Sequence, residues 1–213
     1  MKLKQFLLLA ALGLTASAMF TSCEDILGEW SRPALVTPGT TPTPASYVMA
    51  ADATAEDKGK LICTDGHIHA DGEDADCTKA RVAMIVYLGT TGHATYSHGL
   101  ALALADEGQM NWETAKTRCS GKNASTSTPV TDATWLLASK DQWNYMINAA
   151  GDYTALCDGF SGITGASNLQ SNNYWSSTES ASDRAWNYSF FMDLWGNGLK
   201  SLDDIYVRAC LAF

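Results

Sequence analysis

The sequence predicts an α+β domain in which two helices accompany antiparallel strands. Residues 111–121 and 139–151 each begin with a helix-capping residue and end at a glycine, which is the pattern of a complete helix. Apolar runs of strand length occupy residues 81–88 and 99–105. Aromatic-rich segments with strand-like composition recur from residue 174 onward. These observations place strands on both sides of a helical middle section.

The first 22 residues predict a processing segment that is removed from the mature protein. Lys2 and Lys4 form a basic start, residues 6–20 are largely apolar, and Cys23 follows shortly after this apolar run. The three parts occur in the order of a signal peptide. This arrangement resembles a lipoprotein signal that places a lipid on Cys23. A membrane-spanning anchor is the alternative, but the apolar run is shorter than the about 20 residues that a spanning helix needs.

The residues that follow Cys23 bear on localisation and on partners. Glu24 and Asp25 are similar to signals that send lipoproteins of some diderm bacteria to the outer surface. We therefore expect outer-membrane localisation, with the chain exposed at the cell surface and anchored by a lipid on Cys23. Without the leader, 12 basic residues stand against 23 acidic ones, so the formal charge is −11. This charge excludes a nucleic-acid partner, whose phosphates need a basic face, and electrostatic membrane binding beyond the lipid.

Residues 23–46 are expected to form a tether rather than a folded domain. The stretch 31–46 contains four of the five prolines and several threonines, a composition that favours an extended, semi-rigid spacer. Such a spacer lifts a domain away from the membrane. Residues 47–213 then form one domain of 167 residues, long enough for a single core.

The first part of that domain, residues 47–80, is expected to contain a β-hairpin. Residues 60–64 and 67–70 have strand composition and flank Asp65-Gly66, a strong two-residue hairpin signal. Acidic and histidine side chains suggest a metal site as an alternative: His67, His69, Asp71, Glu73, Asp74 and Asp76. Their spacing matches neither an EF-hand loop nor a paired Cys/His zinc pattern. A hairpin followed by a solvated acidic loop explains the same residues, so we expect no metal and no cofactor.

Two helices are predicted in the middle of the domain. Asn111 provides an N-cap for a helix that ends near Gly121. Ser139 with Gln142 three residues later forms a capping box, and Gly151 stands where that helix stops. A further short helical turn and a long loop rich in glycine, serine and asparagine are expected to follow.

The last forty residues predict three strands and one irregular segment. Residues 174–179, 185–191 and 205–213 have strand-like composition and are expected to form an antiparallel set. Between the second and the third, residues 192–204 contain glycines and aspartates that break the pattern. Trp195 lies there although a polar turn does not need it. Large apolar groups among turn residues are typical of a ligand-contacting loop.

The motifs Y-W-S-S-T-E, A-W-x-x-x-F and V-R-A-C-L-A-F in these last residues resemble the C-terminal part of bacterial domains with the C-type lectin fold. The subclass is that of the formylglycine-generating enzymes and, more narrowly, of the variable proteins of diversity-generating retroelements. The segment N-W-E-T-A-K-T-R-C is similar to the first helix of C-type lectin domains. The segment W-L-L-A-S-K-D-Q-W-N-Y-M is similar to W-R-L-P-T-x-x-E-W-x-Y, with Leu136 in place of arginine and Ala138 in place of proline.

This resemblance covers residues 81–213 and implies a C-type lectin-like fold. In that fold, two helices pack on small antiparallel sheets. The region before residue 81 would then be an N-terminal β-hairpin extension of the domain.

The resemblance also implies a binding face in which diversified side chains stand on a fixed scaffold. The scaffold would consist of Trp186, Phe190, Val207 and Arg208. The diversified, ligand-binding positions would be Tyr188, Ser189, Phe191, Asp193, Trp195, Asn197, Leu199, Leu202, Asp203, Asp204 and Tyr206. Asp193 replaces a glycine that is common there. We expect these side chains to be exposed, so that alanine at Trp195 and Tyr188 leaves stability nearly unchanged; the alternative is that they are core.

The sequence contains no motif that indicates catalysis, and we expect a protein that is not an enzyme. Formylglycine-generating enzymes use a cysteine pair near the end of the domain, whereas only Cys210 lies beyond Asp158. Nucleophile-elbow, zinc-protease and phosphate-loop motifs do not occur. The W-N-D and E-P-N motifs of calcium-dependent sugar binding are missing as well.

The cysteines of the domain predict disulfides. They are Cys63, Cys77, Cys119, Cys157 and Cys210. An exported destination permits disulfides, and an odd number leaves at least one cysteine over. In C-type lectin domains a cysteine of the first helix pairs with one of the final strand, so the resemblance implies a disulfide between Cys119 and Cys210. Cys63 and Cys77 are a second candidate pair, which leaves Cys157.

The combined prediction is a surface-displayed, ligand-binding lipoprotein whose binding face spans residues 188–206. Its partner is expected to be a protein or a cell-surface glycan. The alternative is a structural or adhesive subunit of a surface appendage, in which the terminal strands pair with a neighbouring subunit. Regular self-assembly in solution would favour this alternative.

Overall fold

The computed structural model describes residues 48–72 and 78–213, which belong to one compact unit of the chain. The predicted leader, Cys23 and the tether up to residue 46 lie outside the described residues. Most elements are strands, and they form a seven-stranded and a five-stranded sheet. Of the helices in the described part of the chain, none has the length and apolar character needed to cross a membrane.

The larger sheet has the strand order β1-β3-β2-β4-β5-β12-β7. Its members are β1 (Val48–Met49), β3 (His67–His69), β2 (Leu61–Cys63), β4 (Arg81–Leu88), β5 (Gly99–Ala103), β12 (Ala209–Ala212) and β7 (Thr134–Leu137). Neighbouring strands in this sheet run antiparallel. The predicted hairpin and both predicted apolar strands are confirmed. Every residue of β5 is buried, as expected for an apolar run that is covered on both faces.

The strand β12 lies between β5 and β7 and pairs with both, and all four of its residues are buried. Phe213 follows it and exchanges backbone hydrogen bonds with Gly99, at 3.0 and 3.2 Å. A Cβ at Gly99 would come within 2.4 Å of the Phe213 ring, far closer than carbon atoms approach without repulsion. Glycine at residue 99 therefore leaves the space that the Phe213 ring fills.

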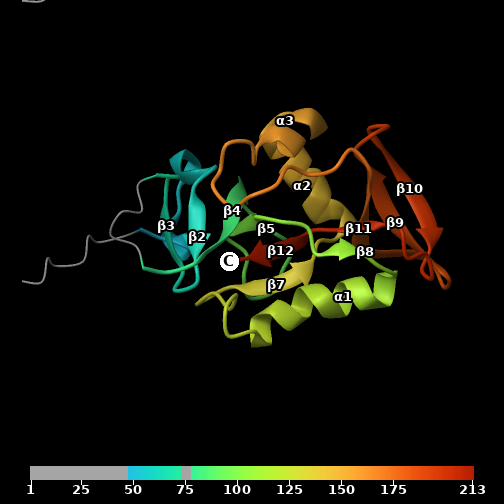
Figure 1. The fold of residues 1–213 in the computed structure, drawn as a ribbon, viewed down its shortest axis with the longest axis horizontal. Helices are drawn as coiled ribbons and strands as arrows, with labels where there is room; N and C mark the ends of the chain where they lie inside the picture. Colours follow the sequence, from blue (N-terminus) through green and yellow to red (C-terminus); the bar gives the residue numbers. More distant parts are fainter. Residues whose placement is uncertain (1–47, 73–77) are drawn as a thin grey trace, which may run out of the picture. The chain divides into compact units, whose positions relative to one another are not determined.

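The smaller sheet has the strand order β10-β9-β8-β11-β6. Its members are β10 (Leu194–Leu199), β9 (Arg184–Ser189), β8 (Asn173–Ala181), β11 (Tyr206–Val207) and β6 (Gly108–Gln109). β8, β9 and β10 form an antiparallel meander, whereas β11 runs parallel to β8 with Tyr206 opposite Tyr174. Figure 1 shows the β9 and β10 hairpin at one end of the fold, away from the β2 and β3 hairpin.

The helices are α1 (Trp112–Gly121), α2 (Lys140–Ala150) and α3 (Tyr153–Asp158), with short 3₁₀ turns η1 (Ala50–Asp52), η2 (Ala55–Asp57) and η3 (Lys122–Ala124). Both predicted helices are confirmed together with their caps. The Asn111 side chain accepts a hydrogen bond from the Thr114 amide at 3.0 Å. Ser139 and Gln142 form the predicted capping box, and Gly151 ends α2 with a φ of 108°, a conformation that favours glycine.

The hydrophobic core lies on both faces of the larger sheet. Ala101 and Ala103 of β5 pack with Trp112 of α1, whereas Leu100 and Leu102 pack with Trp143 of α2 on the opposite face. This division follows from the alternation of side chains along a strand. In Figure 1, α1 lies on one side of the sheet, and α2 and α3 lie on the other.

The predicted α+β, C-type lectin-like fold, with two helices on small antiparallel sheets, is wrong. The structure is mostly β, with a seven-stranded curled sheet, a five-stranded sheet and few short helices. The physical reason lies in the region before residue 81, which was expected to be an extension. Leu61 and Ile62 of β2 pair with β4 and are fully buried, so this hairpin enlarges the central sheet instead of decorating it.

The predicted antiparallel set at the end of the chain is also wrong in part. Residues 205–213 divide into β11 and β12, which belong to different sheets, and β11 runs parallel to β8. The change of sheet occurs at Arg208, which is fully buried. Its Nε donates to Asp106 Oδ1 at 2.7 Å, and its other nitrogens donate to the carbonyl oxygens of Ala103, Ser167 and Asn168.

Candidate ligand-binding surface

The β9 and β10 hairpin carries seven of the eleven predicted binding positions, and the other four follow it in the chain. Ser189 pairs with Leu194, so residues 190–193 form the connecting turn. Asp193 adopts a φ of 53°, in the left-handed region that glycine or a short polar residue fills most easily. Its carboxylate accepts a hydrogen bond from the Tyr188 hydroxyl. The departure from glycine at residue 193 is thus accommodated by a side-chain contact within the hairpin.

Exposed apolar side chains are concentrated on this hairpin and on the turn that follows it. Seven large apolar side chains are exposed in the described part of the chain, and five of them lie between residues 191 and 202. Phe191, Met192 and Leu194 lie at the turn between β9 and β10, and we call these three the apolar tip. Leu199 ends β10 at the other end of the hairpin, and Leu202 lies beyond it. Phe191 is 74% exposed, which costs hydrophobic free energy that a bound partner would recover.

Behind the apolar tip, aromatic rings pack into a supporting layer against α2. The Trp195 ring lies 5.1 Å from the Tyr188 ring and 6.5 Å from the Trp186 ring, both edge to face. Trp195 Nε1 donates to Asn144 Oδ1 at 2.9 Å. The Lys140 ammonium lies 3.5 Å from the centre of the Trp186 ring, a favourable cation–π distance. These contacts hold β10 in place relative to α2.

A groove of about 370 Å³ runs between this layer and the helices. It is lined by Asn144, Ile147, Asn148, Gly151, Asp152, Tyr153, Tyr188, Asp193, Leu194 and Trp195. The lining combines aromatic rings with amide and carboxylate groups. This combination suits a ligand side chain that has both an apolar body and a hydrogen-bonding end.

The structure divides the predicted binding positions by exposure. Seven are exposed: Phe191, Asp193, Asn197, Leu199, Leu202, Asp203 and Asp204. Trp195 and Tyr206 are partly buried, while Tyr188 and Ser189 are buried. The expectation that these positions are exposed is therefore wrong for Ser189 and for Tyr188. Its ring lies 5.0 Å from the core ring of Phe190 and its hydroxyl is bonded to Asp193, so alanine at residue 188 removes core packing.

The predicted scaffold positions are more buried than most of the predicted binding positions. Phe190, Val207 and Arg208 are buried, as a scaffold requires, while Trp186 is partly buried. Met192 and Leu194 belong to the apolar tip but were not among the predicted contacts. Their position inside the segment 192–204, where apolar residues stand among turn formers, was the available signal.

The predicted disulfide between Cys119 and Cys210 is not formed in the structure, where both are buried thiols. Cys119 belongs to the core cluster on the α1 face and Cys210 to the cluster on the opposite face. Burial raises the pKa of the Cys119 thiol to about 12 and that of Cys210 still further, so neither forms a thiolate readily. The proposed pair of Cys63 and Cys77 lies partly outside the described residues.

The chain was compared with protein-family models, with curated proteins and with solved structures. No family model matches the chain, and no curated protein matches it. Among solved structures, the chain is similar to a fimbrial protein from Bacteroides ovatus, with a TM-score of 0.46 and 13% sequence identity. The match covers 73% of this chain and 48% of the fimbrial protein, so the chain spans about half of that protein's length.

Proposed function

We propose that this chain is a surface-displayed binding protein whose apolar tip captures a protein ligand. The observation that carries the proposal is the group of exposed apolar side chains at the turn between β9 and β10, Phe191, Met192 and Leu194. Large aromatic and aliphatic groups provide most of the free energy at protein interfaces. A stable β-meander supports them, which limits the entropy lost when a partner binds.

A protein ligand fits this surface better than a glycan. Phe191, Met192 and Leu194 offer flexible or aliphatic apolar groups, which match apolar side chains of a partner rather than sugar hydroxyls. The tryptophan rings that could stack on a sugar already have partners, since Lys140 lies over Trp186 and Trp195 packs against Tyr188.

The same proposal includes display at the cell surface. The leader pattern of residues 1–22, the cysteine at residue 23 and the proline-rich tether support a lipid anchor in the outer membrane. The acidic charge of the chain keeps the domain away from anionic surfaces. A binding tip on a tether reaches partners beyond the membrane.

Diversification of the tip by a retroelement is a further part of the proposal, supported by the resemblance of the terminal motifs. Exposed positions such as Phe191, Asn197 and Leu199 tolerate replacement because they make few core contacts. The source DNA should contain a near-copy of the codons for residues 174–213 beside a reverse-transcriptase gene, differing mainly at adenines. A complete genome without both would leave a binding protein of fixed sequence.

A second candidate function, a subunit of a surface appendage, is favoured by the position of β10. In the described residues β10 pairs only with β9 and forms an edge of the smaller sheet. An exposed edge can accept a strand from a neighbouring subunit. The strand β12 cannot serve in this way, because β5 and β7 already occupy both of its edges.

The test compares the wild-type chain with a triple variant of the apolar tip, Phe191→Ser, Met192→Ser and Leu194→Ser. Each protein is immobilised and exposed to surface-protein extracts and to a glycan array, and bound partners are confirmed with purified protein. Loss of a hot-spot side chain weakens binding by about 10-fold or more, so we expect the triple variant to lose a protein partner that the wild type retains. Val48→Ser is the matched control, since Val48 is exposed but lies elsewhere.

Three results would contradict this proposal. Equal protein capture by the wild type and the triple variant would exclude the apolar tip as the binding surface. Binding to glycans alone, with no protein partner, would show that the ligand is a glycan and not a protein. Concentration-dependent oligomers that the triple variant abolishes, seen by analytical ultracentrifugation, would favour the appendage subunit.

A further inference from the structure

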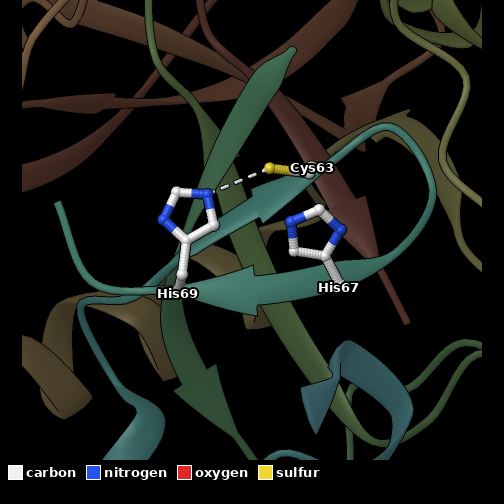
Figure 2. Close-up of side chains that lie close together, drawn as sticks. All are labelled: Cys63, His67 and His69. Carbon is white, nitrogen blue, oxygen red and sulfur yellow. Dashed lines mark hydrogen bonds between the residues drawn. The ribbon is translucent and has the colours of Figure 1, made fainter. Parts of the chain in front are cut away.

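A cysteine and two histidines meet on one face of the hairpin formed by β2 and β3. Cys63 ends β2, while His67 and His69 begin and end β3. Side chains alternate along a strand, and Leu61 pairs with His69 while Ile62 pairs with Ile68. Cys63, His67 and His69 therefore share the face opposite to the two isoleucines. Figure 2 shows the three side chains grouped on one side of the hairpin.

The ligand-type atoms of these three residues lie within 4.8 Å of one another, and all three residues are buried. Cys63 Sγ lies 3.2 Å from His69 Nε2. Sulfur and nitrogen ligands of one tetrahedral zinc ion lie about 3.3 to 3.8 Å apart, given bonds of 2.0 to 2.3 Å. Small side-chain rotations are therefore enough to bring the three atoms to one ion.

His69 has the second partner that is typical of a metal-bound histidine, and His67 has a carboxylate close by. His69 Nδ1 lies 2.9 Å from the Ala70 carbonyl oxygen, so Nδ1 carries the proton and the Nε2 lone pair points at the sulfur. His67 Nδ1 lies 2.5 Å from Asp65 Oδ1, close enough to donate to it after a small rotation, although the present alignment is not that of a hydrogen bond. Metal-bound histidines almost always donate their other ring N–H group to a carbonyl or carboxylate oxygen, which orients the ring.

The charges also balance for a divalent ion. A thiolate at Cys63 and the carboxylate of Asp65 supply two negative charges, which offset the charge of Zn²⁺. Neutral sites of this kind can be buried at an acceptable cost, whereas an unpaired charge cannot. Thiolate and imidazole ligands favour zinc over calcium and magnesium, which prefer oxygen ligands.

We propose that Cys63, His67 and His69 bind Zn²⁺, and that the ion ties β2 to β3 near the turn of their hairpin. Binding releases the thiol proton of Cys63 to solvent. The sequence analysis favoured a solvated acidic loop instead. In the structure the Asp71 carboxylate pairs with Arg81 at 2.5 Å and does not belong to the cluster. Glu73, Asp74 and Asp76 lie outside the described residues.

The experiment uses the purified full chain, stripped of metal under reducing conditions and then titrated with Zn²⁺. We expect one Zn²⁺ per chain by elemental analysis, and a sulfur-to-cobalt charge-transfer band when Co²⁺ replaces it. Cys63→Ser should abolish both. Asp65→Asn, which removes the partner of His67, should weaken zinc binding about 10- to 100-fold. Cys157→Ser and His93→Gln are matched controls outside the cluster and should bind like the wild type.

A second readout guards against variants that fail to fold. Zinc should slow alkylation of Cys63 in the wild-type chain at least 10-fold, while alkylation of Cys157 is unchanged, as read by peptide mass spectrometry. Zinc binding no tighter than in Cys63→Ser would overturn the proposal. Recovery of Cys63 in a disulfide peptide, from protein prepared with zinc present, would overturn it as well.

Discussion

The Arg208 side chain carries a positive charge into a fully buried position, where the chain passes from one sheet to the other. Asp106 is its charge partner, and Tyr174 donates a hydrogen bond to the same carboxylate at 2.8 Å. Burial raises the pKa of Asp106, while the Arg208 charge acts in the opposite direction. The network is stable only when all of its members are present, because each leaves a buried polar group behind when its partner is removed.

Arg208→Met should therefore lower the free energy of unfolding by about 3 to 5 kcal/mol, the range for breaking a buried ion pair. Urea unfolding monitored by tryptophan fluorescence measures this change. Arg184→Met is the control, since Arg184 is exposed and its side chain contacts Asn197 at 3.3 Å; it should change stability by about 0.5 kcal/mol or less. Similar losses for both variants would contradict the role assigned to Arg208.

Asp57 gives the fold a defined response to acid. The hydrogen bond from Lys60 at 2.7 Å, followed by that from the Thr54 amide, lowers the pKa of Asp57 from 3.8 to about 2. A carboxyl group with a lowered pKa in the folded state stabilises the fold above its unfolded pKa. That contribution is complete above about pH 4 and is lost as the pH falls toward 2.

Asp57→Asn should therefore be less stable than the wild type at pH 5, and the difference should shrink by pH 2.5. Urea unfolding of both proteins at the two pH values provides the measurement. Glu56→Gln, at an exposed neighbouring residue, is the control and should follow the wild type. A stability difference that stays constant with pH would show that the Asp57 charge is not the cause.

Among the elements, the helices were predictable and β10 was not. The ends of α1 and α2 can be predicted from Asn111, Ser139 and Gly151, because helix caps depend on contacts between residues that are close in the sequence. The glycines of β10 were interpreted as turn residues, but they have a packing role. A Cβ at Gly198 would lie 3.1 Å from the Trp175 ring, and one at Gly196 would lie 3.2 Å from the Asn187 side chain. A local sequence pattern does not show that side chains of neighbouring strands lie too close to these two positions for a Cβ atom.

The same argument applies to the pairing of β5 with β12, and it can be tested at Gly99. Gly99→Ala places a methyl group within 2.4 Å of the Phe213 ring and 2.9 Å of the Tyr87 carbonyl oxygen. Overpacking of this kind costs about 1 to 3 kcal/mol, which thermal unfolding detects. Gly121→Ala is the control, because residue 121 is helical and a Cβ there meets nothing within 4 Å. It should leave stability unchanged or raise it.

For the whole molecule, the sequence predicted the local elements better than their assembly. The strands 81–88 and 99–105 and the hairpin around Asp65 formed as expected. Their union into one seven-stranded sheet depends on contacts between distant residues, such as Leu102 with Cys210, which no local pattern contains. Among the predicted binding positions, the exposure of Phe191 and Leu199 could be recognised from the sequence, while the burial of Tyr188 could not.

The predicted export and lipid anchoring also concern the whole chain, and both predictions depend on Cys23. The precursor should be cleaved before Cys23 and acylated there, because the basic start, the apolar run and the cysteine occur in the required order. Cys23→Ala should release soluble protein from the membrane fraction, as seen by cell fractionation and immunoblotting. Mass spectrometry that finds a mature, unlipidated start at another residue would contradict this prediction.

The pairing of β12 with β5 has a consequence for how fast the chain reaches its native state. Cys210 and Leu102 pair in adjacent strands although more than a hundred residues separate them. Contacts this distant slow folding, and sheets built from them typically form in milliseconds to seconds. Until that pairing occurs, β5 has no neighbour on one edge and its apolar residues stay uncovered. The interval before β12 docks is therefore when the chain is most exposed to aggregation and most dependent on chaperones.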